Sequence, residues 1–313
     1  MKKQCHNVIK LHFDIIGNGV DIYMSKEISV FSGINSIGIP YTNDNVNHIG
    51  YFEIICENLN NDGYKVNGIN LSNIARNRTF DLEEIFNKNE KYSQIRKNQY
   101  IALKLVRENN KYIGQLIPEK FLNKYAIPDN LDDENITDLY VNSKNPIFLY
   151  SGGENDFMTY IGTGPMELVH KEVRDKLPTN LLELLIKSVD CVEQNWKFLI
   201  NLNPTVQIYA YNVFYAPLYD SIQQEIFKQK KEINPNIKYK NTFEQCIQIF
   251  NRELLNRSKK YDNVEIIDIE FIKDYVANGD FHQNYLGNKL IAEKTMQYIL
   301  ENKRLYDEQA KSK

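Results

Sequence analysis

Five short strand-like runs alternate with helical segments along this chain of 313 residues, and this alternation restricts the possible folds more than any other feature. Each run is rich in β-branched or aromatic residues and is bounded by turn residues. The runs cover residues 27–32, 65–72, 146–151, 205–211 and 264–270. Strands that alternate with helices favour a parallel sheet, because a parallel strand needs a long crossover connection. We therefore expect a three-layer α/β/α sandwich with a central, mostly parallel sheet.

Apolar residues at steps of three and four predict the helices between these runs. One pattern falls in HIGYFEIICENL, and the others fall around residues 181–200, 241–255 and 290–299. The cysteines Cys56, Cys191 and Cys246 lie within such patterns, so we expect them to be small core residues.

Two regions do not follow the alternation. We expect residues 1–26 to be an N-terminal extension packed on the domain, as an edge strand or hairpin. Residues 83–145 are charged and rich in asparagine, and we interpret them as an insertion in the domain that spans residues 27–302, with a strand pair over residues 100–117. The last residues, 303–313, are predicted to be a polar tail.

Composition gives no sign of a charged partner or a metal. The net charge of -3 provides no electrostatic reason to expect nucleic acid or an anionic membrane as a partner. The four cysteines are scattered, without a CxxC or a Cys/His cluster, which argues against a zinc site or a disulfide framework. The N-terminus has no long apolar stretch, so we expect neither a signal peptide nor a membrane span, and a cytoplasmic protein.

Polar residues follow three of the predicted strands. Ser36 comes after the first, Asn155 after the third, and Asp280 and His282 after the fifth. The carboxyl ends of parallel strands meet at one edge of a sheet, where ligands bind. A hydroxyl, an imidazole and an amide donor are the groups that acyl transfer needs.

Each of these residues also has an ordinary structural explanation. A serine after a strand is commonly a turn or helix N-cap residue, and Asn155 fits a turn whose side chain bonds its own backbone. Asp280 and His282 fit a loop pair before the last helix, with Asn284 as its N-cap. Their order along the chain favours the catalytic interpretation.

This order resembles the SGNH hydrolases, also called the GDSL family of esterases and lipases, over residues 27–302. The firmest match is YSGGEND, residues 150–156, which parallels the family's GxND block. The next is FHQN followed by Gly287, which parallels its HPNxxG ending. The resemblance implies an α/β/α sandwich on a parallel sheet of about five strands, similar to flavodoxin. It implies no metal and no organic cofactor.

Under this resemblance, Ser36 is the nucleophile and His282 the general base. The oxyanion hole comprises the Ser36 backbone N–H, a backbone N–H of NIARNRT near Arg76, and the Asn155 amide. Asp280 is the nearby carboxylate that would orient His282. The implied function is a serine esterase or acylhydrolase, and the implied partner is a small-molecule, glycan or lipid ester.

Three positions depart from the family pattern. Asn35 stands where the family has aspartate, Arg76 where it has glycine, and Gly279 where it has the acid. These departures leave one alternative, a catalytically inactive SGNH-fold protein that binds a ligand or partner. A second alternative is an acyltransferase, which would use the same acyl-enzyme and pass the acyl group to an alcohol instead of water. The sequence leaves open the acyl group, the alcohol and the oligomeric state.

Overall fold

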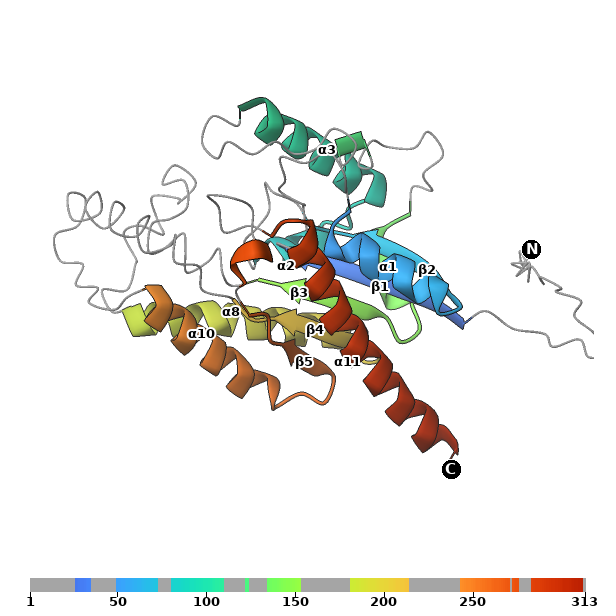
Figure 1. The fold of residues 1–313 in the computed structure, drawn as a ribbon. Helices are drawn as coiled ribbons and strands as arrows, with labels where there is room; N and C mark the ends of the chain where they lie inside the picture. The colour runs from blue at the N-terminus through green and yellow to red at the C-terminus, as the bar shows by residue number, and fades with distance from the viewer. Residues whose placement is uncertain are drawn as a thin grey trace, which may run out of the picture.

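The strands form one parallel sheet in the computed structural model. It describes residues 26–34, 49–72, 80–109, 122–123, 134–152, 181–213, 243–270, 272–275 and 283–311. The strands of these ranges are β1 (Lys26–Ile34), β2 (Tyr64–Asn70), β3 (Ile147–Ser151), β4 (Gln207–Tyr211) and β5 (Val264–Ile267). Their order is β2-β1-β3-β4-β5, and all four neighbouring pairs are parallel (Figure 1). Each predicted run overlaps one strand.

Helices connect these strands. They are α1 (Tyr51–Asn61), α2 (Phe80–Asn87), α3 (Tyr92–Asn109), α5 (Ile136–Val141), α8 (Leu181–Leu202), α10 (Phe243–Ser258), the short 3-10 helix η2 (Lys273–Tyr275) and α11 (Tyr285–Lys311). Four of them, α1, α8, α10 and α11, are the helices that the apolar spacing predicted. Helix α11 continues to Lys311, into the segment predicted to be a polar tail.

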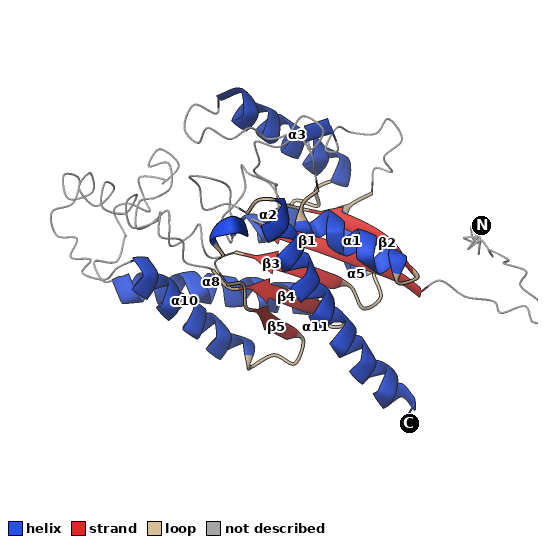
Figure 2. Cartoon of the chain, viewed as in Figure 1, coloured by secondary structure: helices blue, strands red, loops and turns tan. Residues whose placement is uncertain are grey.

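Successive strand residues point to opposite faces of the sheet, and each face has its own apolar core. Val30 and Tyr209 pack on the side of α1 and α11, which Figure 2 shows crossing in front of the strands. Phe31 and Phe148 pack on the other side, against α2, α5, α8 and α10. Trp196 of α8 is fully buried in this second core. The predicted three-layer α/β/α fold is confirmed.

The strand order reverses at β1. The chain goes from β1 to the edge strand β2, and then crosses back to β3 on the other side of β1. In register, Ser32 of β1 pairs with Asn70 of β2, and Ile34 of β1 pairs with Ser151 of β3. Sheets of this type bind ligands outside the carboxyl ends of the strands, at the point of reversal. That point lies between β1 and β3.

The strand pair predicted for residues 100–117 is wrong in its first half, because α3 runs to Asn109. The buried positions of α3 include Ile95, Gln99 and Leu103, which follow one another at helical spacing. A polar residue in the middle of this stripe interrupts the apolar pattern and conceals the helix. The second half of the predicted pair lies outside the described residues.

The predicted core positions of the cysteines are confirmed only in part. Cys246 of α10 is buried and Cys56 of α1 is half-buried, whereas Cys191 is exposed on α8. Cys191 lies beside the apolar stripe of α8 rather than within it, so its place in an apolar-periodic run did not fix its burial.

Both ends of the segment 83–145 are anchored in the core beneath β1 and β3. The rings of Phe86 in α2 and Tyr140 in α5 have centroids 5.3 Å apart, and Tyr140 lies 6.1 Å from Phe148 of β3. This arrangement suits an insertion that is continuous with the domain. The proposed domain boundaries stay a prediction, and of residues 1–26 only Lys26 is described.

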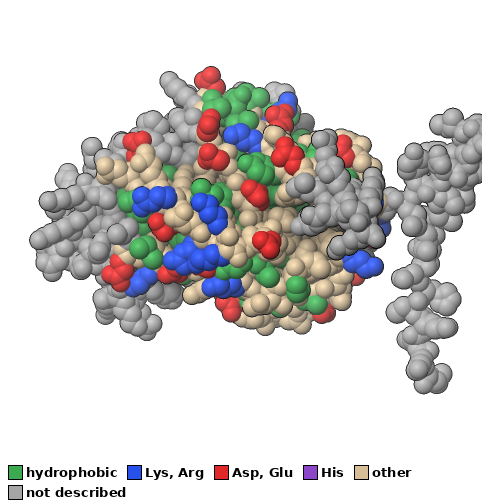
Figure 3. Space-filling model, turned by 90° about the horizontal axis from the view of Figure 1, so that it is seen from below, with side chains coloured by type: hydrophobic (Ala, Val, Ile, Leu, Met, Phe, Trp, Pro, Cys, Tyr) green, Lys and Arg blue, Asp and Glu red, His purple; other side chains and the backbone are tan. Residues whose placement is uncertain are grey.

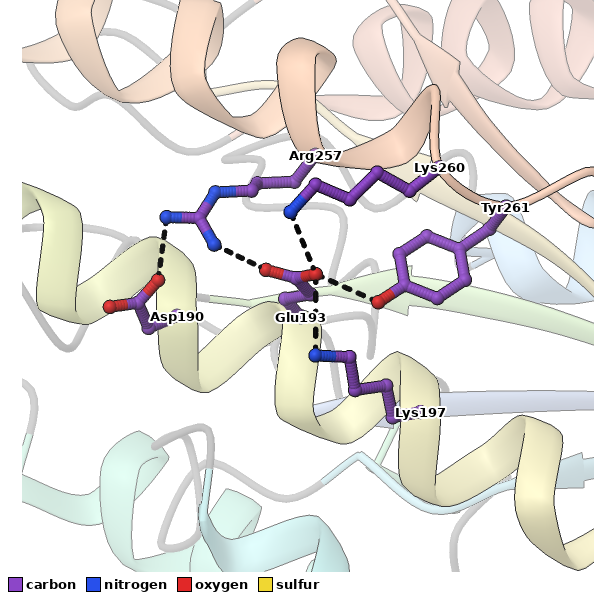
Figure 4. Close-up of polar contacts among 6 residues, drawn as sticks. All are labelled: Asp190, Glu193, Lys197, Arg257, Lys260 and Tyr261. Carbon is purple, nitrogen blue, oxygen red and sulfur yellow. Dashed lines mark hydrogen bonds and ion pairs between the residues drawn. The ribbon is translucent and has the colours of Figure 1, made fainter.

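One charged group is almost completely buried between α8 and α10. The side chain of Glu193 is only 5% exposed, and Figure 4 shows four partners around its carboxylate. These are Arg257 at 2.5 Å, Tyr261 at 2.8 Å, Lys260 at 3.2 Å and Lys197 at 3.4 Å. Arg257 also contacts Asp190 at 2.8 Å. Both carboxylate oxygens are occupied by protein groups, so this cluster joins two helices and is not a site for a ligand.

The pKa of Glu193 reflects these contacts. Burial raises it, but the hydrogen bonds from Tyr261, Arg257 and Lys260 together outweigh burial and lower the pKa from 4.5 to about 2. Because the folded-state pKa is depressed, the ionised carboxylate contributes its full stability above about pH 4.5, and this contribution is lost as the pH falls toward 2.

We predict that Glu193→Gln lowers the free energy of unfolding by about 1.5–3 kcal/mol at pH 7, the range for hydrogen bonds to a charged group. The difference from wild type should shrink between pH 4.5 and pH 2, as measured by urea unfolding. Glu183→Gln is the matched control, because Glu183 lies on the same helix in an exposed pair with Lys187. It should change stability by less than about 0.5 kcal/mol. An equal loss for Glu193→Gln at pH 7 and pH 3 would contradict this interpretation.

Candidate functional site

The predicted site residues lie outside the described part of the chain. These are Ser36, Arg76, Asn155, Asp280 and His282. The structure therefore neither brings them together nor separates them, and their roles stay predictions. It does describe the residues at which the segments that hold them begin and end, and these form a continuous framework at the carboxyl edge of the sheet.

Two of these segments start side by side at the point where the strand order reverses. The last residue of β1, Ile34, precedes Ser36 by two positions. Its register partner Ser151 ends β3 and precedes Asn155 by four positions. Neighbouring strands are about 4.8 Å apart. The chains that lead to the predicted nucleophile and to the predicted amide donor therefore leave the sheet from adjacent places.

A buried polar network fixes the end of β2 against β1. The Ser32 hydroxyl donates to Asn70 Oδ1 at 2.9 Å, and the same oxygen accepts the Ser72 backbone N–H at 3.0 Å. The Leu71 N–H donates to the Ser32 carbonyl at 2.8 Å. Buried polar groups are stable only when they are hydrogen-bonded, and these three side chains are at most 1% exposed. Arg76 follows this turn by four residues.

Helix α3 bonds the same turn from its other side. Gln99 Nε2 donates to the carbonyl oxygens of Asn70 at 2.8 Å and of Ser72 at 2.5 Å. The Asn70 N–H donates to the Tyr92 hydroxyl at 3.3 Å. Burial raises the pKa of this tyrosine, so the hydroxyl stays protonated. The sequence analysis missed both side chains. The signal that could have found them is a polar residue at a core position of an otherwise helical stripe.

The segment that holds His282 is closed at its base. The Asn284 N–H donates to the Tyr275 carbonyl at 3.0 Å, and its side-chain amide donates to the Asp274 carbonyl at 2.7 Å. Asn284 Oδ1 in turn accepts the Gly287 N–H at 3.0 Å. This bond caps α11, so the prediction that Asn284 is its N-cap is confirmed. The residues on either side of this segment are thereby fixed to each other.

The close approach of the Tyr275 backbone requires glycine at position 287. A Cβ atom at this position would overlap the carbonyl oxygen of Tyr275, which is backbone and cannot turn aside. The same carbonyl accepts the N–H of Asn284. Asparagine and glycine three residues apart are therefore explained by one structure, in which the first caps the helix and the second lets η2 approach it.

Asn288 links the starts of α1 and α11. It is fully buried, its Oδ1 accepts the N–H of Tyr51 at 3.1 Å, and its Nδ2 donates to the Asn284 carbonyl at 2.9 Å. Helix α1 begins after the segment that holds Ser36, and α11 begins after the segment that holds His282. One side chain thus joins the far end of the first segment to the far end of the second.

Within the described ranges, no group of three His, Cys, Asp or Glu side chains could hold a metal ion. All five histidines, His6, His12, His48, His170 and His282, lie outside these ranges. The helices in the described residues include none with the length and apolar character that a membrane span needs. The expectations of no metal and no cofactor stay predictions.

Comparison with known proteins gives a likeness of fold. Neither protein-family models nor curated proteins match the chain. The similar solved structures include a lipase, Lip_vut3, from a goat rumen metagenome, with a TM-score of 0.47, 11% identity, and coverage of 87% of this chain and 97% of that one. A lipase/acylhydrolase from Enterococcus faecalis has a TM-score of 0.41, 12% identity, and coverage of 88% and 95%. A family two carbohydrate esterase from Clostridium thermocellum, in complex with cellohexaose, has a TM-score of 0.40, 12% identity, and coverage of 92% and 69%.

These solved structures are lipases and carbohydrate esterases. At TM-scores below 0.5 and identities of 11–12%, the likeness decides nothing about the chemistry of this chain.

We predict that Gly287→Ala lowers the free energy of unfolding by about 1–3 kcal/mol, the usual effect of forcing extra atoms into a packed site. At an unconstrained helical position the same change would stabilise the protein by about 0.5–1 kcal/mol. Leu286→Ala is the matched control, since this neighbouring side chain is half exposed. Chemical denaturation measures both. A stabilised Gly287→Ala variant would show that Tyr275 does not approach the helix in this way.

Proposed function

We propose that the protein is a serine esterase or acylhydrolase that cleaves an ester with Ser36 as nucleophile and His282 as general base. The observation that carries the proposal is the register of β1 and β3 at the reversal point, where Ile34 pairs with Ser151. The segments with the proposed nucleophile and the proposed amide donor begin there. Asn288 supports the proposal further, because it ties together the helices that follow the segments of Ser36 and His282.

The proposed reaction has two halves. Ser36 Oγ attacks the ester carbonyl while His282 accepts its proton, and the resulting oxyanion is bound by the Asn155 amide, the Ser36 N–H and a backbone N–H near Arg76. Collapse breaks the ester bond, and the alcohol leaves with the proton held by His282. A water molecule then gives a proton to His282 and attacks the carbonyl of the acyl group on Ser36. The bond to Ser36 Oγ breaks, His282 returns the proton to Oγ, and a carboxylic acid is released. Asp280, or a backbone carbonyl, would orient the imidazole.

The proposed substrate is a small-molecule, glycan or lipid ester. The face of the molecule in Figure 3 carries both acidic and basic side chains, and several Lys and Arg side chains lie close together on part of it. If an alcohol replaces water in the second half of the reaction, the same acyl-enzyme makes the protein an acyltransferase.

A fluorophosphonate probe tests the nucleophile. We predict rapid covalent labelling of the wild-type protein and none of Ser36→Ala. Ser143→Ala is the control, because Ser143 precedes β3 at the opposite edge of the sheet and bonds the Leu139 carbonyl. It should label like wild type. A folded wild-type protein that is neither labelled nor able to hydrolyse p-nitrophenyl esters of any chain length would contradict the proposal and favour an inactive, ligand-binding protein.

We also predict that Asn155→Ala lowers kcat for a p-nitrophenyl ester by about 10²–10³, the effect of removing one oxyanion donor. The melting temperature should stay close to that of wild type, because the substitution removes a donor rather than a packing contact. Steady-state kinetics and circular dichroism measure the two quantities. Wild-type kcat in this variant would exclude Asn155 from the oxyanion hole.

A further inference from the structure

We infer that Gln99 of α3 is a positioning residue for the proposed oxyanion hole. It holds the turn after β2, and the segment with the proposed donor near Arg76 continues from this turn. The inference rests on the proposed function and deepens it, because it gives the segment 83–145 a part in catalysis. No family motif matched in the sequence includes this residue.

The Gln99 amide donates two hydrogen bonds to one turn. The two N–H donors of the Gln99 amide meet two backbone carbonyls, at 2.8 Å from Asn70 O and 2.5 Å from Ser72 O. Two acceptors two residues apart fix the orientation of two peptide planes relative to each other. The amide is fully buried, so water does not compete for these bonds.

Glutamine at this position brings a cost in stability as well as the two hydrogen bonds. Its Oε1 atom is buried and has no hydrogen-bond partner in the described part of the chain. Burying an unpaired amide oxygen is unfavourable by about 1–3 kcal/mol. The neighbouring stripe positions Ile95 and Leu103 are apolar. An apolar side chain at position 99 would avoid this cost, but it would remove both bonds to the Asn70 and Ser72 carbonyls. Glutamine therefore matches the two carbonyl acceptors of the turn, whereas its unpaired oxygen is unfavourable among the apolar residues of the core.

The other hydrogen bonds of this network also fix the position of the turn. Asn70 is bonded at its N–H by Tyr92, at its side chain by Ser32 and Ser72, and at its carbonyl by Gln99. Side chains of α3 thus bond the backbone of the turn, and the Ser32 hydroxyl of β1 bonds the Asn70 side chain, so the turn is held from two sides. A backbone donor stabilises an oxyanion only when it is aimed before the reaction begins. Fixing the position of this turn should therefore raise the rate of the proposed reaction directly.

The kinetic consequence separates a positioning role from a structural one. Gln99 does not touch the substrate in this scheme, and oxyanion donors act in the transition state. Loss of the two Gln99 hydrogen bonds should therefore lower kcat and leave KM nearly unchanged. A purely structural role would lower the melting temperature and leave the kcat of the folded fraction unchanged.

The experiment compares Gln99→Met with Gln94→Met in the full-length protein. Gln94 lies on the same helix, is exposed, and its amide donates to the side chain of Asn98. For p-nitrophenyl acetate, Gln99→Met should lower kcat by about 10- to 100-fold, the scale expected when a catalytic group is misplaced by about 1 Å. KM should change by less than about 3-fold. Fluorophosphonate labelling should slow in parallel, and Gln94→Met should match wild type.

Tyr92→Phe keeps the test decisive if Gln99→Met does not fold. It removes the hydroxyl of α3 that accepts the Asn70 N–H of the same turn. This change should lower kcat by about 3- to 10-fold at an unchanged KM. Wild-type kcat in the folded variants, with wild type labelled at Ser36, would overturn the role of Gln99 while the esterase proposal stands. Absence of labelling in wild type would overturn the esterase proposal itself, and this inference with it.

Discussion

Parallel pairing on both sides of β1 determines where chemistry can take place in this protein. The chain after β1 leads to α1 on one face of the sheet, and the chain after β3 leads to α8 on the other. In sheets of this kind, ligands bind at the carboxyl ends of the strands where such connections diverge. The apolar cores on the two faces, with Trp196 on one and Ile55 on the other, fix the strands and leave this edge to polar residues.

Amide side chains then hold the connections in place. Asn70, Gln99, Asn284 and Asn288 each bond backbone groups at the ends of strands or helices. At the opposite edge, Asn203 donates to the carbonyls of Tyr140 and Ser143 at 2.9 Å. An amide carries both a donor and an acceptor, so it can satisfy two backbone groups that lack a partner in regular structure. The abundance of asparagine in this chain has a structural use in these contacts.

The sequence predicted the elements whose pattern is local, and missed those whose cause is distant. The strands follow from short β-branched or aromatic runs bounded by turn residues, and the helices α1, α8, α10 and α11 follow from a period of 3.6 residues. Helix α3 was missed because Gln99 breaks its apolar stripe. The need for Gly287 comes from the Tyr275 carbonyl, and the bond from Tyr51 to Asn288 joins residues 237 positions apart. The proposed catalytic residues rest on the order of motifs along the chain.

The most direct measurement is a crystal structure of the protein after reaction with a fluorophosphonate. The proposed chemistry requires the phosphorus atom to be bonded to Ser36 Oγ, with its oxygen accepting from the Asn155 amide. A ring nitrogen of His282 should lie within about 2.6–3.2 Å of Oγ or of the leaving-group position. A phosphonyl group on another residue, or a His282 ring and an Asn155 amide that lie in separate parts of the molecule, would contradict it.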